Sequence, residues 1–169
     1  MSKCKTCDKP TVGKSAYCAE HKAIARQKWL AMVRESTEKR EKLNDKWQAL
    51  FDEGVHAGNN AAAACVPSPM VVQQHKNQLD DNSPVEKEYF VSEGLCGFAW
   101  VVIHPGTCSF ARWLLKNRPN DCGKDYYGGL AVYPSLNTQS VDRKESWART
   151  VCKIFGAAGI NCQTRSRLD

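Results

Sequence analysis

Residues 4–21 read CKTCDKPTVGKSAYCAEH, and this stretch decides how the amino-terminal part of the chain folds. It follows the spacing Cys-x2-Cys-x10-Cys-x2-His, which places two close pairs of metal ligands on either side of a loop. Tetrahedral Zn²⁺ accepts three thiolates and one imidazole, and four protein ligands leave no open position for catalysis. So short a segment has no hydrophobic core, so metal binding would supply its folding free energy, on the order of 10 kcal/mol. We therefore predict a zinc knuckle over residues 1–22 with a structural Zn²⁺ held by Cys4, Cys7, Cys18 and His21.

Four lysines, Lys3, Lys5, Lys9 and Lys14, surround the predicted ligands. Three thiolates, a neutral imidazole and Zn²⁺ together carry a charge of about −1. The lysines either offset that charge locally or face the phosphates of a nucleic acid or another acidic partner. The sequence leaves both interpretations open.

The next segment is predicted to be one long helix over residues 23–53. Residues 19–51 contain neither proline nor glycine and are rich in strong helix formers, and Gly54 is a natural stop. A stripe of residues spaced alternately by three and four is interrupted by polar members, and it comprises Arg26, Trp29, Val33, Ser36, Arg40, Leu43, Trp47 and Leu50. Its tryptophans need cover, which either the rest of the chain or a partner helix in an oligomer can provide.

Residues 54–88 are predicted to be a linker between two modules. The segment contains an alanine run, two prolines and the polar sequence Asp80-Asp81-Asn82, with a single short apolar patch at residues 70–72. So long a connection would be unusual inside one compact domain.

Residues 89–169 alternate between strand and helix patterns. We expect strands at 98–103, 126–133 and 161–167, with helices opening at Ser109 and, capped by Ser140, at Val141. The order β-α-β-α-β predicts a small two-layer sandwich. With the zinc knuckle and the long helix, the whole chain is expected to be an α+β protein.

This module also carries a possible anion or ligand site. Gly128 and Gly129 follow the pair Tyr126-Tyr127. The glycines either form a simple bend at the start of a strand or let the backbone approach a ligand closely, with the tyrosine rings as stacking surfaces. Two arginines spaced by two in a strand share a face and could chelate a phosphate, or could form a solvated basic edge. The candidate residues are Tyr126, Tyr127, Arg143, Lys144, Arg165 and Arg167.

Composition and cysteine usage indicate an intracellular protein. The net charge of +6 and pI near 8.8 favour contact with phosphates or acidic partners. No secretory signal and no membrane-spanning apolar run is recognised, so nine cysteines are expected to be thiols or metal ligands. The six outside the zinc pattern are interpreted as small core or surface thiols. No catalytic set can be assembled, since His104 would need Cys108 or Asp125 brought near it by the fold, and we predict no enzyme activity.

The carboxy-terminal half resembles a group of small uncharacterised proteins of tailed bacteriophages. The resemblance rests on the sequences CGFAWV at 96–101, YYGG at 126–129, QSVDRK at 139–144 and SRLD at 166–169, with PMVV at 69–72 upstream. It implies a phage-encoded protein acting in the cytoplasm of a bacterial host, and it brings no activity or catalytic residues. The zinc segment and the long helix look like an addition to that core.

Three functional hypotheses remain. The first is a non-enzymatic phage accessory protein whose basic zinc module and helix bind nucleic acid or a host protein. The second is binding of a small phosphorylated ligand, such as a nucleotide signal, by the carboxy-terminal module. The third is an assembly role in which the long helix mediates oligomerisation. None of these involves a membrane.

Overall fold

The computed structural model describes residues 3–12 and 14–169 and has a mixed α+β fold. The chain divides into two compact units, Met1–Lys46 and Trp47–Asp169. A single helix, α1 (Ala19–Ala64), contributes residues to both units. Among the described residues, no helix combines the length and apolarity that a membrane span requires.

The first unit consists of a small loop followed by the amino-terminal part of α1. Backbone hydrogen bonds fold the loop back on itself: Cys4 N donates to Lys9 O and Lys5 N to Ala16 O, each at 3.0 Å. Every side chain of α1 from residue 22 to residue 46 is exposed, and Trp29 has 61% of its surface exposed. The described residues of this unit therefore leave the apolar stripe of the helix uncovered.

Helix α1 continues to Ala64, so the expected end at residue 53 is wrong. Gly54 and Gly58 lie inside the helix and are buried. A Cβ atom at Gly54 would lie 2.8 Å from the Phe155 ring, and one at Gly58 would lie 2.8 Å from the Val151 side chain. Glycine at these positions therefore allows close packing of a helix against its neighbour rather than ending it.

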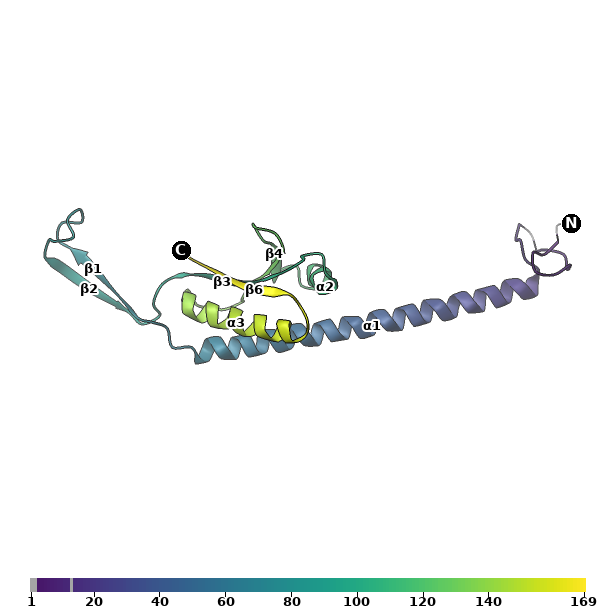
Figure 1. The fold of residues 1–169 in the computed structure, drawn as a ribbon, viewed down its shortest axis with the longest axis horizontal. Helices are drawn as coiled ribbons and strands as arrows, with labels where there is room; N and C mark the ends of the chain where they lie inside the picture. The colour runs from purple at the N-terminus through teal and green to yellow at the C-terminus, as the bar shows by residue number, and fades with distance from the viewer. Residues whose placement is uncertain (1–2, 13) are drawn as a thin grey trace. The chain divides into compact units, whose positions relative to one another are not determined.

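In the second unit a four-stranded antiparallel sheet has the strand order β4-β5-β3-β6. Strands β3, β4 and β6 of this sheet are labelled in Figure 1. The strands are β3 (Gly97–Ile103), β4 (Cys122–Lys124), β5 (Leu130–Val132) and β6 (Cys162–Leu168). Helices α2 (Ser109–Asn117) and α3 (Val141–Ala157) follow β3 and β5 respectively. The strand expected at 126–133 is shortened to β5, because residues 126–129 form the turn between β4 and β5, in which Gly128 and Gly129 both have φ of +92°.

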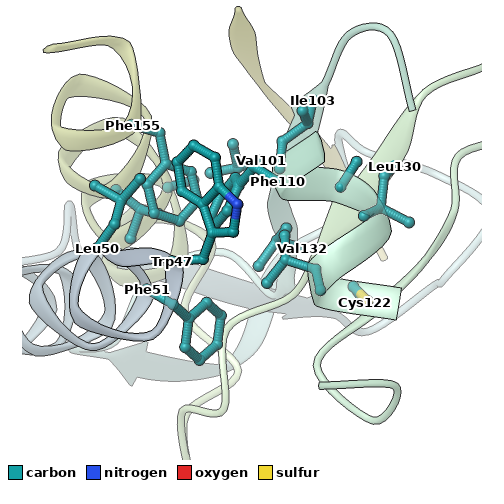
Figure 2. Packing of buried hydrophobic residues seen from close by; sticks show 14 of the residues in the cluster. Trp47, Leu50, Phe51, Val101, Ile103, Phe110, Cys122, Leu130, Val132 and Phe155 are labelled. Carbon is teal, nitrogen blue, oxygen red and sulfur yellow. The ribbon is translucent and has the colours of Figure 1, made fainter. Parts of the chain in front are cut away.

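The hydrophobic core lies on one face of this sheet, under α2, α3 and the carboxy-terminal part of α1. Alternate residues of β3, Ala99, Val101 and Ile103, are buried there. Aromatic rings join the helices: the Phe110 ring centroid lies 5.2 Å from that of Trp47 and 5.0 Å from that of Phe155. Figure 2 shows these rings converging with Leu50 and Phe51 from α1. Within the described residues of this unit, the core contacts of α1, α2 and α3 all lie on this one face, and on the other face the turn before β5 lies close to Val102, which is fully buried.

Two further strands occupy part of the segment expected to be a linker. β1 (Met70–His75) pairs antiparallel with β2 (Val85–Val91), with Met70 opposite Val91. The intervening polar residues form a turn in which Lys76 N donates to Pro84 O at 3.0 Å and Asn82 N to an Asp80 carboxylate oxygen at 3.0 Å. Composition alone indicated a flexible connection, whereas the β-branched valines and these turn residues form a hairpin.

Candidate functional site

The structure brings the four predicted ligands of the zinc pattern together. All four donor atoms lie within 4.8 Å of one another. The Nδ1 atom of His21 is 3.5, 3.4 and 3.3 Å from the Sγ atoms of Cys4, Cys7 and Cys18, and the Sγ atoms of Cys7 and Cys18 are 3.7 Å apart. With metal–sulfur bonds of about 2.3 Å and a metal–nitrogen bond of about 2.0 Å, a tetrahedral site has ligand separations of roughly 3.5–3.8 Å. The cluster is therefore positioned to hold one metal ion, and its geometry is compatible with structural zinc.

Local structure explains how these ligands meet. Cys18 directly precedes α1, and its carbonyl accepts a hydrogen bond from Lys22 N at 2.9 Å. His21 follows in the first turn of the helix, so the second ligand pair is fixed by helix geometry. The hydrogen bond between Cys4 N and Lys9 O closes the turn that carries the first pair.

The electrostatics of the cluster favour a cation at its centre. Burial would raise the pKa of Cys4, but hydrogen bonds from the backbone of Thr6, Cys18 and Cys7 lower it to about 6. For Cys7, a backbone hydrogen bond at Lys9 lowers the pKa, but burial and the Cys18 and Cys4 thiols outweigh it and raise the value. Adjacent thiolates repel one another, and a divalent ion between them removes that repulsion.

The four lysines around the cluster differ in their surroundings. Lys9 Nζ lies 2.7 Å from a Glu20 carboxylate oxygen, which raises the pKa of Lys9, and Lys3 Nζ lies 3.8 Å from Asp8 Oδ1. Lys5 and Lys14 form no ion pair with the described part of the chain. Two of the four cations therefore remain available to an external anion.

The candidate ligand residues of the second unit fall into two places. Arg167 pairs with Phe98 across the strands, and Arg165 with Trp100, so both arginines share the face of the sheet opposite the core, as their spacing predicted. Lys144 Nζ reaches the same place, 4.9 Å from the Phe98 ring centroid, and donates to Gly97 O at 2.7 Å.

Arg165 is held in place by an acidic partner. Its Nη1 atom lies 2.8 Å from Oδ2 of Asp125, whose side chain is 3% exposed, and its guanidinium carbon lies 4.9 Å from the Tyr127 ring centroid. Trp100 Nε1 and Tyr127 N also donate to the Asp125 carboxylate, each at 3.0 Å. The Arg165 guanidinium is thus paired with a buried carboxylate, whereas Arg167 forms no ion pair with the described residues.

Arg143 lies apart from this group. Its Nε and Nη2 atoms contact the Glu93 carboxylate at 2.8 and 3.1 Å, and its Nη1 atom donates to Ala62 O at 3.0 Å and Ala63 O at 3.4 Å. The side chain therefore satisfies carbonyl groups at the last turn of α1, a structural role that its position in the first turn of α3 did not indicate.

Sequence reasoning missed two other features. The first is the structural role of Asp125, which the sequence indicated only as a possible partner of His104. His104 Nε2 instead lies 3.1 Å from Gln163 Nε2. Cys108 caps α2 by accepting a hydrogen bond from Ala111 N. The position of Asp125 before a Tyr-Tyr-Gly-Gly turn was the available signal, since Asp commonly accepts from the backbone two residues on.

The second missed feature is a thiol pair. The Sγ atoms of Cys152 on α3 and Cys162 on β6 are 3.1 Å apart, although the sequence showed no paired spacing among these cysteines. Burial, with a smaller contribution from the Cys152 thiol, raises the pKa of Cys162 to about 12. Both residues lie in or against the core, which agrees with the expectation of small core thiols for this pair.

Comparison with protein-family models, with curated proteins and with solved structures gives no match to this chain.

Proposed function

We propose that this protein is a non-enzymatic accessory protein of a phage and acts in the bacterial cytoplasm. Its amino-terminal unit, stabilised by a structural zinc ion, binds nucleic acid. The observation that carries the proposal is the distribution of charge. Residues 1–34 contain eight Lys and Arg against two Asp and Glu, a net charge of +6, whereas residues 35–169 contain sixteen of each. The entire excess positive charge of the protein therefore belongs to the metal loop and the adjoining helix.

Zinc is the metal that suits this site best. Three thiolates and an imidazole in a tetrahedral arrangement are typical of structural Zn²⁺, and the four protein ligands leave no position for a substrate. The ion would fix the loop carrying Lys3, Lys5, Lys9 and Lys14 at the start of α1. Its contribution is to hold a recognition surface rather than to perform chemistry.

Nucleic acid fits this surface because it is a polyanion of regular charge spacing. Of the eight cations, Lys3 and Lys9 are ion-paired within the described residues, and six are not: Lys5, Lys14, Lys22, Arg26, Lys28 and Arg34. If all six contact phosphates, log K should fall with log salt with a slope of about −5 for duplex DNA. A host protein with an acidic face is the alternative partner, and it predicts a shallower dependence.

The test is a fluorescence anisotropy titration of the zinc-loaded protein with duplex and single-stranded DNA and RNA at several salt concentrations. The double variant Lys22→Glu/Arg26→Glu should weaken binding strongly and reduce the salt slope. Its matched control is Arg40→Glu/Lys42→Glu, which makes the same charge change on exposed residues of the same helix, in the segment of zero net charge. Absence of salt-dependent binding, or an equal loss in both variants, would refute the proposal.

Self-association through α1 is a second candidate, favoured by the exposure of Trp29 (61%), Leu30 (49%) and Val33 (42%). Isolated apolar residues on a helix surface are ordinary, but these three lie within five residues of one another. Light scattering of the full chain and of Trp29→Ala tests it: a dimer that dissociates in the variant supports it, and a monomeric parent protein excludes it.

A further inference from the structure

The face of the four-stranded sheet opposite the core contains a hollow of about 480 Å³. Its lining includes Phe98 and Trp100 of β3 together with Tyr126, Lys124, Lys144 and Arg167. Small-molecule sites have volumes from about 300 Å³ upward and combine aromatic walls with a few polar groups. All residues that line the hollow belong to the second unit, so the inference drawn from it does not rest on nucleic-acid binding by the amino-terminal unit.

Two aromatic side chains that line this hollow, Phe98 and Tyr126, are exposed. Phe98 is 41% exposed although its strand is otherwise mostly buried, because residues 99, 101 and 103 point to the core and residue 98 points away from it. Tyr126 is 91% exposed, and its ring meets that of Tyr127 edge-on at 4.9 Å. Exposed aromatic rings gathered at one place offer stacking surfaces for a planar ligand.

Three cations stand beside these rings without acidic partners. Arg167 Cζ lies 5.2 Å and Lys144 Nζ lies 4.9 Å from the Phe98 ring centroid. The third cation, Lys124, also lines the hollow. Within residues 3–12 and 14–169, no carboxylate forms an ion pair with any of the three. The acid in the lining, Asp125, is already paired with Arg165. The hollow therefore carries an unmatched positive charge, which suits an anion.

The site is also held in shape before any ligand arrives. Asp125 is buried and accepts hydrogen bonds from Trp100, Arg165 and the backbone of Tyr127, which ties the tyrosine turn to strands β3 and β6. At Gly129, a Cβ atom would lie 2.7 Å from Ile103 O, so only glycine lets the turn approach the sheet so closely. Asp125 is thus a positioning residue, and none of its hydrogen bonds needs to break on binding.

A nucleotide has a planar base, which can stack on exposed aromatic rings, and a phosphate, which can contact cations that have no acidic partner. We propose that this face of the sheet binds a nucleotide unit, the base stacking on Phe98 and Tyr126 and the phosphate contacting Arg167, Lys144 and Lys124. The nucleotide is either a free mononucleotide or one unit of a single strand, because both present the same base and phosphate to the site.

The experiment is isothermal titration calorimetry on the zinc-loaded full chain with AMP, adenosine, inorganic phosphate and an eight-residue oligothymidylate. Phe98→Ala and Arg167→Ala should each weaken binding about tenfold or more. Phe98→Tyr, which keeps the ring, should retain binding. Phe90→Ala on β2 and Arg112→Ala on α2 replace an exposed phenylalanine and an exposed arginine elsewhere in the same unit, and they should leave it unchanged.

The arms distinguish the two sources of the nucleotide. Binding of AMP that is lost in Phe98→Ala assigns a free mononucleotide, and Phe98-dependent binding of the oligonucleotide alone assigns a single strand. Oligonucleotide binding that responds to Lys22→Glu/Arg26→Glu but not to Phe98→Ala, together with no Phe98-dependent binding of AMP, would support the amino-terminal surface and overturn this site. Inorganic phosphate binding as tightly as AMP, or no binding sensitive to Phe98 and Arg167 in variants with unchanged circular dichroism, would also overturn it.

Discussion

Replacing Gly58 by alanine tests the packing of α1 against α3. Alanine favours a helix interior over glycine by about 1 kcal/mol, so the substitution would stabilise an isolated helix. In this protein the new Cβ would lie 2.8 Å from Trp147 Cδ1 and from Val151 Cγ2, where contacts of about 3.5–4.0 Å are normal. Trp147 is 1% exposed and Val151 is fully buried, so neither side chain can move aside without disturbing the core.

The expected magnitude follows from these opposing terms. Overpacking of a core by one methyl costs typically about 1–3 kcal/mol. Movement of Trp147 would also weaken the hydrogen bond of its Nε1 to Asn59 Oδ1, now 3.1 Å long, which is worth about 1 kcal/mol. After the helix-propensity gain, Gly58→Ala should lower the free energy of unfolding by about 1–3 kcal/mol.

Urea unfolding followed by tryptophan fluorescence measures this change, since four of the five tryptophans belong to the second unit. The matched control is Gly156→Ala near the end of α3, where a Cβ would meet nothing within 4 Å; it should be neutral or stabilising by up to about 1 kcal/mol. Adding Val151→Ala to Gly58→Ala makes room for the methyl, so the double variant should be more stable than the sum of the single effects. If Gly58→Ala stabilises the protein as much as Gly156→Ala does, the described packing is wrong.

Three further predictions concern titration and metal removal. At pH 8, iodoacetamide should modify Cys162 more than about 100-fold more slowly than the exposed Cys96, because burial and Cys152 hold the Cys162 thiol protonated; mass spectrometry of timed samples measures this, and equal rates would contradict it. The Arg143 hydrogen bond lowers the pKa of Glu93, so its stabilisation is present above the unfolded value of about 4.3 and is lost as the pH falls through the folded value. Glu93→Gln should therefore lower the melting temperature at pH 7, and the difference should vanish in acid; a pH-independent difference would exclude this cause. Chelation of the metal should open residues 3–22 to trypsin while leaving the urea transition of the second unit unchanged, and continued protection would argue against a structural ion.

The features that could be predicted from the sequence depend on neighbours a few residues away. The ligand spacing of the Cys/His pattern determines two turns, and one ion can join them wherever the rest of the chain lies. The alternation of β6 likewise places Arg165 and Arg167 on one face through strand geometry alone. Both conclusions needed no knowledge of long-range packing.

The features that could not be predicted depend on contacts between distant segments. Gly54 carries the same local signal whether it ends a helix or accommodates Phe155, a hundred residues further on. The stripe of α1 runs without a change of period from exposed Trp29 to buried Trp47, so periodicity cannot show where burial begins. The partner of Arg165 is Asp125, forty residues earlier, and only the fold pairs them.

The net charge of a chain and the charge of its sites carry different information. In the second unit acidic and basic side chains are equal in number, and four arginines, Arg118, Arg143, Arg149 and Arg165, are each paired with a carboxylate. An electrically neutral unit can nevertheless hold a local anion site, because Lys124, Lys144 and Arg167 lie together beside aromatic rings and away from the acids that balance them in the total. In the first unit the excess is visible in the sequence itself, because too few acids balance it. The two surfaces should therefore respond differently to salt: many phosphate contacts give the amino-terminal unit a steep dependence, whereas stacking on Phe98 should persist when the ionic contribution is screened.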